Sequence, residues 1–200
     1  MNPPAVRPRC LVCDLPRATC VCALVERVDN AVDVLLLQHP LEVREAKGSA
    51  RLLRLGLARC RVLVGETFDP SVLEPLLHAQ GRRSVLLYPG DAATGSSTGA
   101  GHAPTQLVVL DGTWRKSLRM LRSNPPLQAL PRLALEPESA GRYGALRKAR
   151  LDSQLSTLEA TCAALSRLEG DDARYAPMLR AFERFVDDRA ARSGVSTKPK

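Results

Sequence analysis

Short apolar runs alternate along this chain with segments of helical character, and this alternation constrains the fold more than any other feature. The runs cover residues 31–38, 60–64, 84–90 and 107–110. Helices are expected over residues 49–59 and 71–80, the second with Pro70 at its start and Gly81 after its end. Strands that alternate with helices of this length form parallel sheets covered by helices on both faces. We therefore predict an α/β fold with a parallel sheet flanked by helices.

The pattern weakens after residue 121, where a proline-rich stretch offers one edge strand at residues 131–135. Ser156 or Thr157, with Glu159 close behind, predicts a capped helix start, and a last helix is expected over residues 175–192. Residues 91–105 are expected to be a flexible loop. The predicted domains are an N-terminal segment of residues 1–28, an α/β domain of residues 29–192 and a tail of residues 193–200.

Four cysteines crowd into thirteen residues near the N-terminus. Cys10, Cys13, Cys20 and Cys22 have the spacing C-x2-C-x6-C-x-C, and the first pair has the spacing of thiolate zinc sites. Because no export signal precedes them, they favour metal over disulfides. We predict a closed structural zinc site. An iron–sulfur cluster or four reduced cysteines without metal are the alternatives.

Charge and composition limit the partners. The formal net charge is +8 and the pI is about 9.6, which is typical of proteins that bind a polyanion, although arginine can also serve as a solvated surface residue. Aromatic residues make up only 4%, which argues against a broad platform for stacked bases. The sequence contains no run of about twenty apolar residues and no signal-peptide core, so we expect a cytoplasmic protein without a membrane partner.

The segment 105–121 combines a strand, a glycine turn and a helix start. The strand ends at Asp111, Gly112 turns, Thr113 is placed to cap the helix, and Trp114 follows as the only tryptophan. Ligands of open parallel sheets bind where strands end and helices begin. Asp111 is therefore a candidate general base, or else it only anchors the turn. Trp114 is a candidate ligand contact, or else it packs in the core.

Basic residues gather in three sets that predict a phosphate track for RNA if they share one face. The sets are Arg44, Lys47 and Arg51; Arg115, Lys116 and Arg119; and Arg142, Arg147, Lys148 and Arg150.

Four separated pieces of the sequence together resemble the DTW-domain family of tRNA-uridine aminocarboxypropyltransferases. They are the four-cysteine head, the strand end LLYPG, the segment LDGTWRKSLRML and the pair RYGALRKAR and QLSTLEA, and they span most of residues 10–165. The family pattern often has an asparagine–threonine pair near Gly48 and Ser49, and this chain departs from it there.

The resemblance implies transfer of the 3-amino-3-carboxypropyl group from S-adenosylmethionine to N3 of a uridine in tRNA. It also implies a fold similar to the SPOUT methyltransferases, with a C-terminal trefoil knot. Asp111 would then be the catalytic base in a monomeric enzyme. The residues expected at S-adenosylmethionine are Leu87, Tyr88, Pro89, Gly90, Leu110, Gly112, Thr113, Trp114, Ser156 and Thr157. Two alternatives are an S-adenosylmethionine-dependent RNA methyltransferase and a non-catalytic zinc-containing module that binds RNA.

Overall fold

The computed structural model describes residues 8–45, 48–90, 103–135 and 155–192. Its strands are β1 (Asp33–Gln38), β2 (Cys60–Val64), β3 (Ser84–Leu87), β4 (Gln106–Asp111) and β5 (Arg132–Leu133). Its α-helices are α1 (Ala50–Gly56), α2 (Pro70–His78), α3 (Trp114–Ser123), α4 (Pro125–Gln128), α6 (Thr157–Glu169) and α7 (Ala176–Arg192). Short 3-10 turns include η2 (Cys22–Leu24), η3 (Pro40–Glu42) and η4 (Ala79–Gly81).

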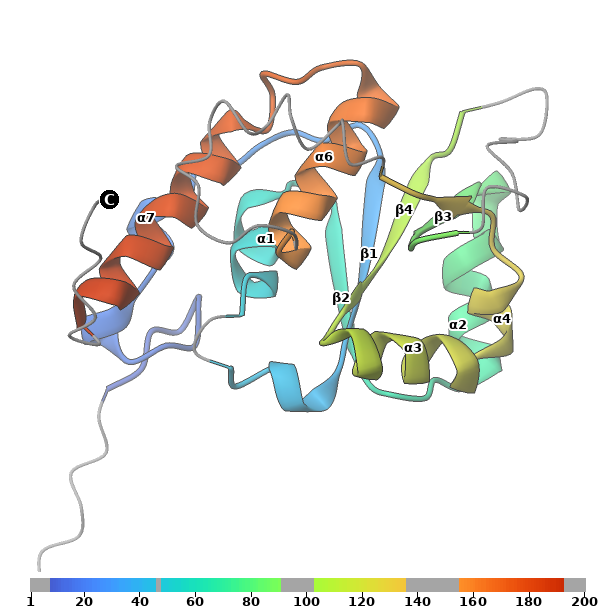
Figure 1. Cartoon of the computed structure of the whole chain (residues 1–200), viewed down its shortest axis with the longest axis horizontal. Coiled ribbons are helices and arrows are strands. Elements are labelled where there is room, and N and C mark those ends of the chain that lie inside the picture. Colours follow the sequence, from blue (N-terminus) through green and yellow to red (C-terminus); the bar gives the residue numbers. More distant parts are fainter. Residues whose placement is uncertain (1–7, 46–47, 91–102, 136–154, 193–200) are drawn as a thin grey trace, which may run out of the picture.

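The five strands form one parallel sheet in the order β2-β1-β4-β3-β5 (Figure 1). This confirms the predicted fold class. The central strands β1 and β4 are the most fully buried, as their almost continuous apolar sequences require. The trefoil knot stays a prediction, because residues 136–154 between β5 and α6 lie outside the described residues.

Side-chain alternation along the strands divides the core into two layers. Val34 and Leu36 of β1 face α1, α6 and α7, whereas Leu35 and Leu37 face α2, α3 and α4. Figure 1 shows these two groups of helices on opposite faces of the sheet.

The chain leaves β1 and β4 toward opposite faces of the sheet. After β1 it continues to α1 on one face, and after β4 it continues to α3 on the other. The two strands are direct neighbours, so their carboxyl ends form a topological switch point, where α/β sheets bind ligands. Gln38 and Asp111 are paired in register at this point.

The N-terminal head contributes to the same core. Cys13, Leu15 and Val21 are buried together with side chains of α1 and α7. Backbone carbonyls of the head also accept hydrogen bonds from Arg54 of α1 (2.8 Å, to Val12) and Arg192 of α7 (2.8 Å, to Ala18). The proposed domain limits at residues 28 and 192 stay predictions.

Several local details differ from the sequence predictions. Asp111 is the last residue of β4 instead of following the strand, and β3 ends at Leu87, before the Tyr-Pro-Gly segment. Thr113 occupies the N-cap position of α3, but its side chain makes no capping hydrogen bond. The proline-rich stretch contains a short helix, α4, because Pro125 at its first position has the fixed φ that a helix start needs.

None of the helices in the described ranges is long and apolar enough to cross a membrane.

Candidate active site

The Asp111 carboxylate lies at the end of β4 and points toward the start of α6. It is 5% exposed. Its Oδ1 accepts a hydrogen bond from the Thr157 hydroxyl at 2.7 Å, and its Oδ2 accepts one from Nε2 of Gln38 at 2.9 Å. Burial raises the pKa of the Asp111 carboxyl above its ordinary value, while the two donated hydrogen bonds act in the opposite direction. Two distant segments, residues 38 and 157, thus hold one acidic group in a dry position.

Side chains fix the start of α6. Ser156 and Glu159 form a capping box, in which Ser156 Oγ accepts from Glu159 N–H (3.2 Å) and Glu159 accepts from Ser156 N–H (2.8 Å). Leu158 N–H donates to Ser49 Oγ at 3.2 Å. Three amide groups at this helix start are therefore occupied, and the Thr157 hydroxyl is fixed toward Asp111.

A network of charged side chains surrounds the same edge of the sheet. His39 Nδ1 accepts from Leu41 N–H at 3.2 Å, so Nε2 carries the proton that is shared with Glu66 at 2.9 Å. Glu66 also pairs with Arg119 of α3 at 2.7 Å. The backbone N–H of His39 donates to the carbonyl of Asp111 at 3.0 Å. The loops after β1 and β2 are thereby tied to the loop and helix that follow β4.

A second ion pair links η3 to α3 on this edge. Glu42 and Lys116 are 2.7 Å apart and both are largely shielded from solvent. The negative charge of Glu42 also contributes to the raised pKa of Asp111. Sequence reasoning missed Gln38, Glu42 and Glu66. Their positions at or within four residues of the ends of apolar strands were the available signal, but which strands are neighbours could not be read from it.

Tyr88 and Trp114 form an aromatic corner beside the strand ends, in which Trp114 is exposed and Tyr88 is half-buried. Their ring centroids are 5.9 Å apart with an interplanar angle of 78°. The Arg132 guanidinium lies 5.3 Å from the Tyr88 centroid. Trp114 is 54% exposed, which excludes ordinary core packing for this residue. The corner therefore offers aromatic surface to a ligand.

The remaining residues expected at the ligand have varied positions. The Leu110 side chain is buried with α3 and α4, so only its backbone faces the strand end, and Leu87 packs against the opposite core layer. Gly112 lies close to α3, where an added Cβ would be 3.1 Å from Lys116 Cβ. Pro89 is exposed and Gly90 is half-buried.

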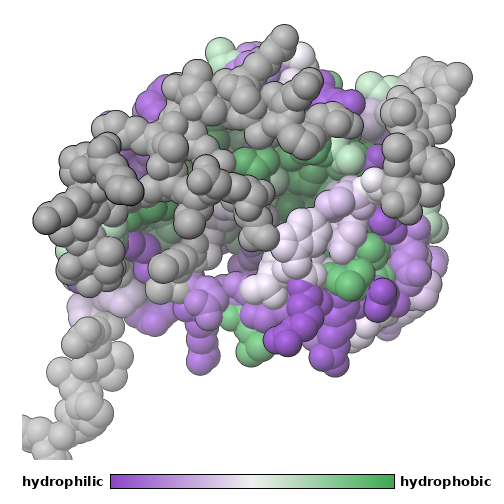
Figure 2. All heavy atoms as spheres, viewed as in Figure 1, coloured by the Kyte–Doolittle hydropathy of each residue, from purple (hydrophilic) through white to green (hydrophobic). Residues whose placement is uncertain are grey.

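The predicted basic residues are brought together only in part. Arg44 and Arg115 are exposed, Arg51 is half-buried and donates to the Val43 carbonyl at 3.2 Å, and Lys116 is paired with Glu42. Figure 2 shows hydrophilic side chains gathered over the region of α3. Five predicted cations lie outside the described residues: Lys47, Arg142, Arg147, Lys148 and Arg150.

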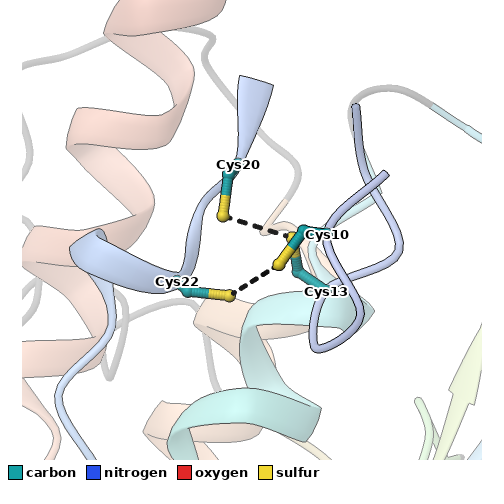
Figure 3. Close-up of side chains that lie close together, drawn as sticks. All are labelled: Cys10, Cys13, Cys20 and Cys22. Carbon is teal, nitrogen blue, oxygen red and sulfur yellow. Dashed lines mark hydrogen bonds between the residues drawn. The ribbon is translucent and has the colours of Figure 1, made fainter. Parts of the chain in front are cut away.

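The four cysteines of the head form one cluster, as predicted (Figure 3). All four sulfur atoms lie within 4.8 Å of one another, with 3.8 Å between Cys10 and Cys22 and 3.7 Å between Cys13 and Cys20. A tetrahedron with Zn–S bonds of about 2.3 Å has edges of about 3.8 Å, so the spacing fits four thiolates around zinc.

The loop between the first two cysteines is shaped for a metal site. Backbone hydrogen bonds from Cys13 and Val12 lower the pKa of Cys10 to about 6, which favours the thiolate that a metal binds. Asp14 closes the loop with a φ of 56° and pairs with Arg9 at 2.9 Å. The cluster could therefore hold a metal ion.

Comparisons with known proteins agree with the sequence pattern. The family model of the DTW domain matches residues 7–190. A Drosophila melanogaster protein named tRNA-uridine aminocarboxypropyltransferase 2 is 30% identical over 177 residues, which cover 84% of this chain and 69% of that protein. No solved structure matches the chain. The Asp-Gly-Thr-Trp segment at the switch point lies within the matched region, and the chain belongs to the DTW-domain family.

Proposed function

We propose that this chain transfers the 3-amino-3-carboxypropyl group of S-adenosylmethionine to N3 of a uridine in tRNA. The proposal rests on the family, on the name of the fly relative and, above all, on one observation. That observation is the buried Asp111 carboxylate, fixed by Thr157 and Gln38 at the switch point of the sheet.

Asp111 is the proposed general base. The N3–H of uridine is a weak acid, and its proton must leave as the new N–C bond forms. Each oxygen of the Asp111 carboxylate accepts one hydrogen bond from the protein and keeps a lone pair for another donor. The raised pKa makes this carboxylate a stronger base than an exposed aspartate, and its two fixed donors hold it in one orientation.

S-adenosylmethionine, when bound, supplies a carbon that is already activated by its sulfonium. The exposed Trp114 ring, with the half-buried Tyr88 beside it, would hold the donor, and a sulfonium is suited to the face of an indole ring. Gly112 would allow the backbone to approach it closely. The orientation of the donor beside these residues would decide whether its methyl group or its aminocarboxypropyl group faces the nucleobase.

The remaining parts are assigned structural and binding roles. Four cysteine thiolates complete a tetrahedral shell, which suits a structural zinc. Arg44, Arg51 and Arg115 are the described cations proposed to contact tRNA phosphates near the reacting uridine. We further propose that the enzyme is a cytoplasmic monomer.

Mass spectrometry of a tRNA transcript treated with the protein and S-adenosylmethionine tests the function. The expected product is a uridine that gains an aminocarboxypropyl group, with release of methylthioadenosine. A uridine that gains a methyl group, with release of S-adenosylhomocysteine, would establish the methyltransferase instead. Unchanged RNA, together with no calorimetric heat from millimolar S-adenosylmethionine, would favour the non-catalytic RNA-binding module.

A further inference from the structure

Two cavities lie at the edge of the sheet where the strands begin, opposite to Asp111. One has a volume of about 240 Å³ and lies between the starts of β1 and β2 and helix α2, with Arg59, Arg61 and Arg82 in its lining. The other has a volume of about 490 Å³ and lies beside the start of α7, with Arg27 and Arg59 in its lining. Because Arg59 lines both cavities, they adjoin each other across the sheet edge.

The arginines of these cavities are mostly not neutralised by carboxylates. The Arg59 guanidinium donates to the Ala31 carbonyl at 3.3 Å, and that of Arg27 donates to the Ala58 carbonyl at 3.4 Å. Within the described part of the chain, no hydrogen bond or ion pair engages the Arg61 guanidinium. Backbone carbonyls orient a guanidinium without removing its charge, so these groups keep donors for an anion.

Acidic residues reduce this positive charge only in part. Arg82 and Asp33 are 3.7 Å apart, which is a long ion pair, and Asp29 lines the second cavity. Arg174 also lines that cavity, but it is paired with Glu169 at 2.6 Å. Without Arg174, the two linings together contain four arginines and two aspartates, so their net charge is 4 − 2 = +2.

The arrangement suits several phosphates in a row better than one. Arg27, Arg59, Arg61 and Arg82, which we name the arginine strip, follow two adjacent open cavities instead of closing around one point. A guanidinium binds phosphate with two parallel N–H groups, so successive arginines can contact successive phosphates of a nucleic-acid backbone.

We propose that the arginine strip is a second RNA-binding surface that contacts the sugar-phosphate backbone of the substrate away from the reacting nucleotide. Gln106 lines the first cavity and Asp111 lies at the other end of the same strand, β4. At roughly 3.3 Å per residue, the two sites are about 17 Å apart. An RNA that places a uridine at Asp111 reaches the strip only if it extends around the domain, so a folded RNA is favoured over a short oligonucleotide.

The salt dependence of RNA binding tests the strip. The probe is an unmodified tRNA transcript, and its affinity for the full chain is measured by fluorescence anisotropy between about 50 and 200 mM salt. The variant is the double substitution Arg59→Gln and Arg61→Gln. The control is Arg180→Gln with Arg184→Gln, which removes the same charge from exposed positions on α7.

The slope of log affinity against log salt is negative, and the loss of two phosphate contacts should make it shallower by about 1.4, at about 0.7 per contact. When the salt concentration rises fourfold, the affinity of the unmodified chain should fall by a factor roughly seven times larger than the factor for the strip variant. The α7 control should keep the original slope. An unchanged slope in the strip variant, or an equal change in the α7 control, would overturn the proposal.

Two further measurements keep the outcome clear. If the double variant unfolds at a lower temperature, Arg61→Gln alone replaces it, and half the change in slope is expected. If millimolar inorganic phosphate stabilises the unmodified chain but not the variant, while the RNA slope is the same for both, the site binds a small anion and the RNA assignment is wrong.

The inference rests on the proposed function only in taking RNA as the ligand. An Asp111→Asn chain should bind the transcript with the same salt slope as the unmodified chain, even though its transfer should be slower by about 10²- to 10⁴-fold. If the unmodified chain transfers nothing while the strip variant still shows the reduced salt slope, only the proposed chemistry is refuted. If the unmodified chain transfers the group and the strip variant keeps the original slope, only the strip is refuted.

Discussion

Replacing Asp111 by asparagine or by alanine should separate its catalytic role from its structural role. Asparagine has the same size, and one of its side-chain atoms still accepts the Thr157 hydroxyl, while the Gln38 amide can turn to accept from the other. Alanine leaves both donors, which are half-buried, without this acceptor. An unsatisfied buried donor costs about 1–3 kcal/mol, so with two half-buried donors alanine should lower the free energy of unfolding by about 1–3 kcal/mol in total. That is a large part of the 5–15 kcal/mol typical of a domain.

Transfer should fall in both variants, by about 10²- to 10⁴-fold if Asp111 is the base. Activity is measured as aminocarboxypropyl uridine formed per unit time, and stability by urea unfolding of the same preparations. An asparagine variant that folds as well as the unmodified chain and turns over at the same rate would refute the proposed base. An alanine variant of unchanged stability would refute these two hydrogen bonds.

The stability difference between Asp111 and asparagine should also depend on pH. The pKa of Asp111 is raised in the folded chain, so the folded state holds this proton more tightly than the unfolded state. Its contribution to stability is therefore present below the ordinary aspartate pKa of about 4 and is lost as the pH rises through the raised value. Asparagine has no such dependence. From pH 4 to pH 7, the asparagine variant should gain stability relative to the unmodified chain, and urea unfolding at both pH values checks this.

Three other perturbations test separate parts of the account. Trp114→Ala should change the unfolding temperature little, because the indole is 54% exposed, and a large loss of stability would contradict that position. Calorimetry should show weaker S-adenosylmethionine binding by this variant, and Trp114→Phe should partly restore the binding. A strong chelator should remove zinc, detected by metal analysis, and lower the unfolding temperature, because Cys13 and Leu15 belong to the core; a chain purified without metal at full stability would contradict the site. Gly56→Ala should destabilise the fold by about 1–3 kcal/mol in urea unfolding, because the new Cβ would lie 2.8 Å from Met178 Cε; an unchanged free energy would mean that this side chain moves aside at little cost.

Local sequence signals predicted the parts of the fold that depend on short-range physics. The strand at residues 60–64 was predicted with its observed limits, because an apolar run between two turn regions leaves few alternatives. The start of α6 was predicted from Ser156 and Glu159, which form a capping box within four residues. The cysteine cluster followed from spacing alone.

Features that depend on long-range pairing were not predicted. Thr157 and Asp111 were both selected, but their hydrogen bond joins residues 46 positions apart and requires the order of the strands. Gln38 becomes part of the site only because β1 pairs with β4 in a particular register. The exposure of Trp114 depends on how α3 lies against β4 and α4, and helical periodicity cannot determine that.

The pH dependence of transfer in single turnovers tests the central claim most directly, when the unmodified chain is compared with Thr157→Val. The Thr157 hydroxyl stabilises the carboxylate, and without it the pKa of Asp111 should rise further. The rate should fall toward acid in both chains, above the ordinary aspartate pKa of about 4, and the fall should occur at higher pH in the valine variant. Identical profiles for the two chains, or no fall in rate above that pH, would contradict the assignment of Asp111 as the group that accepts the proton.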